Sequence, residues 1–253
     1  MTPQSSPTPT PTPTPSSALP ARSEIVARFG SRVPKQWGME VTGLVLRSAS
    51  PQVCLTYDAC GGPYGSKVDQ ELLDLLIREN IPATLFLNQR WIEVNRPTFD
   101  QIASSPTLFD IGNHGTRHMP LSVTGKMAYN EPATQNAGEV YDEVAGNHHY
   151  LTTLLGKPPR FFRTGTAHYD EVAIEIVRAM GEIPIGFDIN GDAGTTFTTA
   201  QVIQETGRAK KGSIVIAHMN QPSRQTYEGM AVILPRLRDK GTAFARLSDV
   251  TLT

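Results

Sequence analysis

Short apolar runs of strand character alternate with stretches of helical spacing along most of this chain. The runs are almost wholly apolar, as in ATLFL at 83–87 and SIVIA at 213–217, which is typical of strands covered on both faces. Seven such alternations predict a mostly parallel sheet with helices outside it. The predicted strands are 53–57, 83–87, 108–111, 160–163, 183–187, 213–217 and 243–247.

The segments between these strands carry apolar residues three and four positions apart, which predicts amphipathic helices. Both a barrel and an open doubly wound sheet fit this alternation. No GxGxxG follows the first strand, so nothing favours a dinucleotide-binding fold. The predicted helices are 68–76, 99–104, 140–155, 169–180, 200–210 and 227–239.

The length and charge of the chain narrow the functional classes. It has 253 residues, with 23 basic and 24 acidic side chains. This near-neutral balance argues against nucleic acid or an anionic membrane as the main partner. No apolar run reaches the roughly 18 residues that a transmembrane helix needs.

The first residues, MTPQSSPTPTPTPTPSSALP, are of low complexity. Alternating proline and threonine cannot pack a core and prefers extended geometry. We therefore expect a disordered tether over 1–20 and one folded domain over 21–253. Such tethers are frequent after a secretion signal or a lipid anchor, so we expect a secreted, periplasmic or envelope-tethered protein, although the first residues do not resemble a signal peptide.

The chain has two cysteines, Cys54 and Cys60. Six residues of extended strand span about 20 Å, far beyond disulfide reach. We expect no bond between these two thiols, and they do not report the redox compartment.

Chemically capable side chains follow five of the predicted strands, at the point where each strand ends. In a parallel α/β fold these strand ends lie on one rim, where active sites are built. Their joint placement predicts one pocket. Two further histidines, His148 and His149, lie in the middle of a predicted helix and not at a strand end, so they are interpreted as surface or packing residues. The residues at the strand ends are Asp58, His114, His118, Arg163, His168, Asp188, Asp192 and His218.

Each of these elements alone also has a simpler interpretation. An aspartate after a strand, such as Asp58, is often a helix cap or turn former. His114 and His118 lie four apart, which suits either a surface helix or the start of a zinc site. Arg163 fits a rim salt bridge, and His218 fits a core histidine with a satisfied ring.

Five ordered motifs resemble those of the polysaccharide deacetylase family, which is built on the NodB-homology domain. They are TYDAC, HGTRH, FRTGTA, FDINGDA and IVIAH, and they span Thr56 to His218. The resemblance implies a distorted (β/α) barrel of about seven parallel strands. It also implies a metal-dependent hydrolase that removes acetyl groups from an acetylated polysaccharide or oligosaccharide, such as the N-acetylglucosamine polymers peptidoglycan and chitin.

The resemblance also implies a role for each site residue. Asp58 would be the general base, paired with and oriented by Arg163. His218 would be the general acid for the leaving amine. Asp192 would orient His218, with Asp188 as the alternative because the motif spacing differs by one.

Three further positions concern the metal and the carbonyl group. The resemblance implies that His114 and His118 bind a divalent metal, usually Zn²⁺. It implies that the backbone N–H of Thr166 donates to the oxyanion. These roles meet the independent needs of amide hydrolysis for an activated water, a base, an acid and positive potential at the carbonyl oxygen.

The sequence departs from the family pattern in three places. Thr164 and Gly165 replace the usual prolines of the third motif, and Ala193 replaces the tryptophan of the fourth. These two changes bear on the shape of the sugar pocket. The third change bears on the metal, because Ala59 stands where the family has a metal-binding aspartate.

Three residues could replace the missing ligand. Asp58 could itself bind the metal, and His168 could reach in from a neighbouring loop. Cys60 falls on the same side as Asp58 by strand alternation, but the glycines that follow weaken this argument, and turn packing is the preferred interpretation for Cys60. A retained metal is favoured, since base, acid, arginine and both histidines remain.

Two other functions stay open. One is a catalytically silent carbohydrate-binding domain on the same fold. The other is a hydrolase of a different carbon–nitrogen bond, because relatives of this fold act on small cyclic amides.

Overall fold

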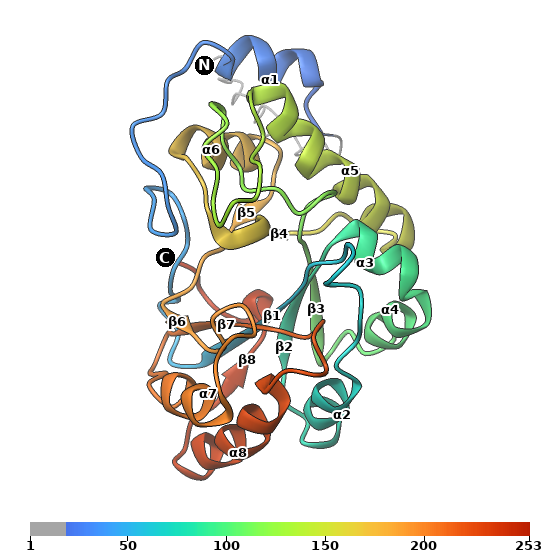
Figure 1. The fold of residues 1–253 in the computed structure, drawn as a ribbon, viewed down its shortest axis with the longest axis vertical. Coiled ribbons are helices and arrows are strands. Elements are labelled where there is room, and N and C mark those ends of the chain that lie inside the picture. The colour runs from blue at the N-terminus through green and yellow to red at the C-terminus, as the bar shows by residue number, and fades with distance from the viewer. Residues whose placement is uncertain (1–18) are drawn as a thin grey trace, which may run out of the picture.

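The structure is a computed structural model that describes residues 19–253. The tether predicted over 1–20 therefore lies outside the described residues, apart from its last two. Figure 1 shows a curved sheet with helices around its outside. Among the described helices, none is both long and apolar enough to cross a bilayer.

The sheet is parallel and runs in the order β5-β4-β3-β2-β1-β7-β6, with β8 paired to β1 beside this row. It curls into a half-closed barrel, so the predicted distorted (β/α) barrel of about seven parallel strands is confirmed. The strands are β1 (Val53–Ala59), β2 (Ala83–Leu87), β3 (Phe109–Asn113), β4 (Phe161–Phe162), β5 (Ile183–Pro184), β6 (Ile189–Asn190), β7 (Ile214–His218) and β8 (Phe244–Ala245).

The helices begin at residues that suit a helix N-terminus. Asp69 and Asp170 each accept a backbone N–H of the first turn that follows, from Leu72 and Ala173. The longest helix is capped by Gly156, whose φ of 69° is a left-handed conformation that glycine adopts without strain. The helices are α1 (Arg22–Phe29), α2 (Gln70–Arg78), α3 (Gln89–Val94), α4 (Arg96–Ala103), α5 (Ala137–Leu155), α6 (Glu171–Ala179), α7 (Thr199–Thr206) and α8 (Thr226–Asp239).

The central strand β1 separates two cores by simple alternation. Leu55, Tyr57 and Ala59 point outward into a core that they share with the apolar faces of α2 and α8. Cys54 points inward, to a second core inside the curl. Asp58 has the parity of Cys54, so its carboxylate lies on the inner side at the end of the strand.

A segment that precedes β1 ties distant parts of the chain together. Val45 bridges to Ile185, beyond the end of β5, and Arg47 bridges to Ser213, at the start of β7. Ser48 bridges to Leu252 at the other end of the chain. This segment therefore links the two ends of the curled sheet.

The structure adds elements that the apolar pattern did not predict. The helices α1 and α3 and the strand β6 are short and carry few periodic apolar residues. Three predicted strands are also shorter than expected, since β4, β5 and β8 each have two paired residues. β5 lies at one border of the sheet with β4 next to it, where long ladders are not required, whereas β8 pairs with the start of the central strand β1.

Candidate metal and active site

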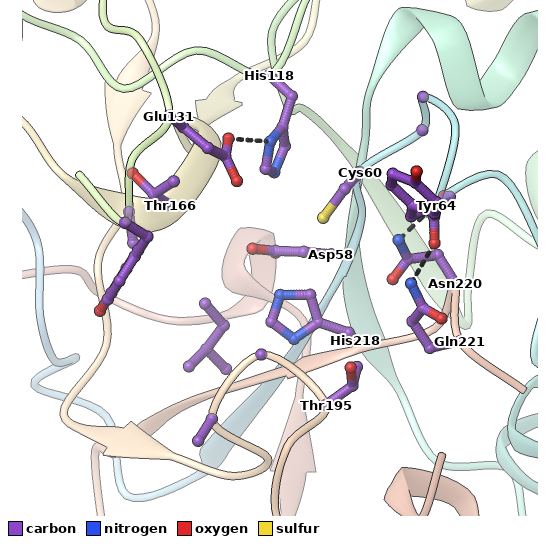
Figure 2. A pocket seen from close by; sticks show the side chains of 18 of the residues that line it. Asp58, Cys60, Tyr64, His118, Glu131, Thr166, Thr195, His218, Asn220 and Gln221 are labelled. Atoms are coloured by element: carbon purple, nitrogen blue, oxygen red, sulfur yellow. Dashed lines mark hydrogen bonds and ion pairs between the residues drawn. The ribbon is translucent and has the colours of Figure 1, made fainter. Parts of the chain in front are cut away.

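The predicted site residues of four segments meet at the carboxyl ends of the strands. Asp58 is the second-last residue of β1 and is the register partner of His218, which ends β7. His114 directly follows β3, and Arg163 directly follows β4. Figure 2 shows Asp58, His218 and the cluster around Cys60 facing one space.

Asp58 and Arg163 form an ion pair away from solvent. One guanidinium nitrogen of Arg163 donates to Asp58 Oδ1 at 2.8 Å and to Thr56 Oγ1 at 2.8 Å. The other nitrogens donate to the carbonyl oxygens of Ile185 and Gly186. The remaining carboxylate oxygen, Oδ2, is left to face His114 at 3.8 Å. The arginine therefore fixes the carboxylate and leaves one oxygen of it for chemistry.

Cys60, His114 and His118 form a cluster in which one potential ligand atom of each lies within 4.8 Å of the others. The Cys60 Sγ lies 3.8 Å from His114 Nε2. One thiolate sulfur and two imidazole nitrogens are a donor set that Zn²⁺ accepts readily. The residues present thus fit the divalent metal that the sequence predicted.

The tautomer of His114 suits a ligand. Its Nδ1 lies 2.8 Å from the carbonyl oxygen of Arg163. A carbonyl oxygen only accepts, so Nδ1 carries the proton and donates. Nε2 is then left with its lone pair toward Cys60, as a metal ligand requires.

His118 has a carboxylate behind it that the sequence did not predict. Its Nδ1 lies 3.4 Å from Glu131 Oε2. Figure 2 draws this contact on the far side of the ring from Cys60. A carboxylate in this place fixes the ring and makes it a stronger donor through Nε2.

The cluster changes the acidity of the Cys60 thiol. Burial raises its pKa, but His118, His114 and His218 outweigh burial and hold the pKa well below the ordinary value. This shift favours the thiolate, which is the form that binds metal. Turn packing, the role preferred from the sequence, is wrong for this side chain: strand alternation carries past the end of β1 and turns the sulfur inward.

His168 does not join the cluster. Its Nδ1 donates to the carbonyl oxygen of Thr166 at 2.8 Å, and its ring contacts the rings of Trp37 and Tyr129. Of the three candidates for the missing ligand, the structure brings Cys60 to the histidines and leaves His168 outside.

Asp192, not Asp188, lies against His218. The His218 Nδ1 lies 2.9 Å from Asp192 Oδ1, and the backbone N–H of His218 donates to Oδ2 at 2.8 Å. Thr226 donates to the same oxygen at 3.0 Å. Asp188 instead pairs with Arg47 and with the start of β7.

This pairing shifts the pKa of both partners. Burial lowers the pKa of His218, but the Asp192 carboxylate overrides burial and raises it well above the usual value. Burial raises the pKa of Asp192, and His218 and Thr226 outweigh it and lower that pKa. Asp192 therefore keeps His218 protonated at neutral pH.

The altered third motif is explained by a close approach. A Cβ on Gly165 would come within 2.2 Å of the His118 carbonyl oxygen, so no side chain fits there. Next to it, the Thr164 hydroxyl donates to the Met119 carbonyl oxygen at 2.7 Å. Both contacts hold the third motif against the segment that carries His118.

Thr166 lies in the pocket wall with φ at 60°. Its hydroxyl oxygen is buried and has no partner among the described residues. This conformation is uncommon for a threonine. Donation from its backbone N–H to an oxyanion remains a prediction.

One cavity of about 730 Å³ is lined by part of the site, namely Asp58, Cys60, His118, Thr166 and His218. Beyond the predicted residues, its wall includes several that the sequence did not single out. No apolar period or motif marks them: Arg90 lies in the short helix α3, and the others lie on loops. They are Tyr64, Arg90, Tyr129, Glu131, Thr195, Asn220 and Gln221.

The fold and the cluster define an α/β protein of the NodB type with a possible metal centre at the carboxyl rim of its sheet. The family model "Polysaccharide deacetylase" matches residues 47–182, more than half of the chain. The chain therefore belongs to the polysaccharide deacetylase family. The matched range contains the Asp58–Arg163 pair and the Cys60 cluster and ends before Asp192.

The similarity to individual proteins is more distant. The uncharacterized protein YlxY of Bacillus subtilis (strain 168) is 19% identical over 189 residues, which is 74% of this chain. The chain spans about half, 54%, of that curated relative.

Two solved structures match with a TM-score of 0.67. One is a CE4 family pseudoenzyme from Bacillus anthracis, 17% identical, over 84% of this chain and 69% of that one. The other is the Bc1960 peptidoglycan N-acetylglucosamine deacetylase, 21% identical, over 83% of this chain and 92% of that one. At these identities the likeness shows the fold alone.

Proposed function

We propose that this protein is a metal-dependent hydrolase that removes acetyl groups from an acetylated polysaccharide or oligosaccharide. The observation that carries the proposal is the convergence of Asp58, His218, Cys60 and His118 on one cavity, with His114 completing the cluster of Cys60 and His118 behind the cavity wall. Base, acid and metal ligands are the groups that hydrolysis of an acetyl amide or ester requires.

The metal centre has a defined task in this proposal. A divalent ion held by Cys60, His114 and His118, which we expect to be Zn²⁺, would supply Lewis acidity at the acetyl carbonyl and lower the pKa of water. Glu131 holds His118, and the Arg163 carbonyl holds His114, so both rings are oriented before substrate arrives.

The protein's own groups move the protons. Asp58 Oδ2, free of the arginine, accepts a proton from the attacking water. His218 donates from Nε2 to the leaving nitrogen or oxygen of the sugar, because its Nδ1 is engaged by Asp192. The backbone N–H of Thr166 donates to the developing oxyanion.

The fold points to a class of substrate. A structural neighbour is named as a peptidoglycan N-acetylglucosamine deacetylase, and this supports an N-acetylglucosamine polymer as the substrate of the present chain. The low-complexity N-terminal sequence supports action outside the cytoplasm or in the cell envelope.

A second function has its own support. A neighbour with the same TM-score is named a pseudoenzyme, and Ala59 replaces an acid that the family motif carries. A catalytically silent carbohydrate-binding domain therefore remains the alternative, and a hydrolase of another carbon–nitrogen bond is a third possibility.

One experiment separates these functions. Purified protein is analysed for bound metal and assayed for acetate release from N-acetylglucosamine oligosaccharides, peptidoglycan and acetylated xylan. We expect stoichiometric metal and acetate release, which the Asp58→Asn variant loses while its circular dichroism spectrum is unchanged. Saccharide binding without acetate release supports the silent domain. Ring opening of cyclic amides to the corresponding acids, followed by mass spectrometry as the gain of one water, without acetate release supports the third function.

A further inference from the structure

We infer that Tyr64 and Tyr129 are stacking platforms for the sugar rings on either side of the residue that is deacetylated. The inference rests on the proposed function for the class of ligand, a neutral chain of at least three pyranose rings. It starts from the exposure of these two rings, which are 89% and 70% exposed.

Exposed aromatic rings are confined to this cavity. Seven large hydrophobic side chains are exposed in residues 19–253, and five of them are aliphatic. The two aromatic ones, Tyr64 and Tyr129, both line the cavity. An aromatic ring with an exposed face at a pocket is suited to bind a ligand, because exposed apolar surface contributes nothing to the stability of the fold.

The backbone presents Tyr129 at a cost. Ala128 and Glu131 form an antiparallel bridge, and the two residues between them, Tyr129 and Asn130, have φ of 51° and 63°. Positive φ at both central residues is a turn geometry that asparagine and glycine prefer and that a tyrosine disfavours. The ring meets the His168 ring edge-on, with centroids 5.2 Å apart, so the turn holds it upright beside the cluster.

Tyr64 is presented by a second fixed turn. The backbone N–H of Gly61 donates to the Gly65 carbonyl oxygen at 2.9 Å, which closes the loop around Tyr64. Asn220 donates to the same oxygen at 3.0 Å and ties the loop to the segment after β7. The ring therefore projects from a fastened loop and not from a loose end.

The two turns lie on opposite sides of the reactive groups. Figure 2 shows Tyr64 on one side and Glu131, from the Tyr129 turn, on the other, with Asp58 and Cys60 between them. A sugar whose acetyl group reaches the cluster would thus have a tyrosine beside each neighbouring ring.

The chemistry between the turns fits a neutral saccharide. The axial C–H groups of a pyranose ring meet the negative face of an aromatic ring favourably. Thr195 and Gln221 line the cavity with neutral hydrogen-bonding groups. Buried oxygens of Asn220 and Thr166 lack a partner in the described chain, and sugar hydroxyl groups would satisfy them.

The test measures binding apart from turnover. In an Asp58→Asn background, the Kd values of the hexasaccharide and the disaccharide of N-acetylglucosamine are measured by calorimetry, with acetylated xylohexaose as a second probe. Tyr64→Ala and Tyr129→Ala are each compared with the Phe and Trp substitutions at the same position. Val94→Ala serves as a control, because Val94 is 64% exposed and lies outside the cavity wall.

We expect each alanine variant to weaken hexasaccharide binding about tenfold and to shrink the preference for the hexasaccharide over the disaccharide. The Phe and Trp variants and the Val94 control should bind as the parent does. The inference is overturned if both alanine variants bind the hexasaccharide as tightly as the parent does. It is also overturned if the parent binds neither the N-acetylglucosamine hexasaccharide nor acetylated xylohexaose. Tyrosine-dependent binding with no acetate release by the unsubstituted chain overturns only the proposed function.

Discussion

The charged groups of Arg163 and Asp58 lie 2.8 Å apart where solvent reaches almost nothing of either side chain. The arginine also donates to Thr56 and to two backbone carbonyl oxygens, and its guanidinium lies 4.4 Å from the centre of the Phe86 ring. A buried charge that loses its partner is strongly destabilising.

Replacing Arg163 by Met should therefore destabilise the fold as well as stop turnover. We expect the free energy of unfolding, from urea denaturation, to fall by about 3–5 kcal/mol, because Asp58 is left charged and unpaired. The double variant with Asp58→Asn should lose less than the sum of the two single variants. Additive losses would show that the pair is not coupled.

Cys60 should be a metal ligand with a spectroscopic signature. The Co²⁺-substituted protein is expected to show a sulfur-to-metal charge-transfer band that Cys60→Ala loses together with most of its metal. In the unsubstituted chain, alkylation of Cys60 should require a chelator. Cys54 is an internal control, because burial raises its thiol pKa to about 12 and keeps it unreactive throughout. Retained metal and an unchanged band in Cys60→Ala would assign the third position to Asp58 or to solvent.

Restoring the family's acid at position 59 should not repair the site. Ala59 is fully buried in the outer core, opposite Leu87. A carboxylate there has no partner, so Ala59→Asp is expected to lower the free energy of unfolding by about 3 kcal/mol or more and to reduce turnover. Ala59→Ser is the matched control for size. The melting temperature and the rate of acetate release of Ala59→Asp test this prediction. Tighter metal binding together with faster acetate release would refute it.

The His218–Asp192 pair should make stability depend on pH. Folding raises the pKa of His218, so its contribution is complete below about 6.5, the unfolded value, and is lost as pH rises through the folded pKa. Folding lowers the pKa of Asp192, so its contribution is present above about 3.9 and is lost as pH falls through the folded pKa. The free energy of unfolding of the unsubstituted protein should therefore exceed that of Asp192→Asn by the largest amount between about pH 3.9 and about pH 6.5. A difference that does not change with pH would count against the ion pair.

The sequence predicted the fold and the rim of the site because both depend on periodicity. Apolar runs mark the long central strands, and the residue after each run is placed at the rim by topology alone, as for Asp58 and His218. Alternation also gave Cys60 the right side, although the glycines after it favoured the wrong role. The roles of these residues in catalysis stay predictions.

Other parts of the site could not be read from a pattern. Glu131 and Tyr129 lie on a turn between β3 and α5, and the fold brings this turn to His118 through contacts that have no period. The choice between Asp188 and Asp192 depended on how the chain turns around Gly191. The two carboxylates, four residues apart, contact opposite ends of β7, and only the three-dimensional path of the chain shows which of them meets His218.

The bridge between Ser48 and Leu252 and the pairing of β1 with β7 have a consequence for biosynthesis. The innermost strand is made early but has neighbours on one side that are made some 160 residues later, as Cys54 and Ile214 show. A nascent chain can form the β1–β2–β3 ladder on the ribosome, with one long apolar edge of β1 still open. This edge is covered only once β7 and β8 have been made, so a chain truncated before Ile214 should leave the edge unpaired and aggregate.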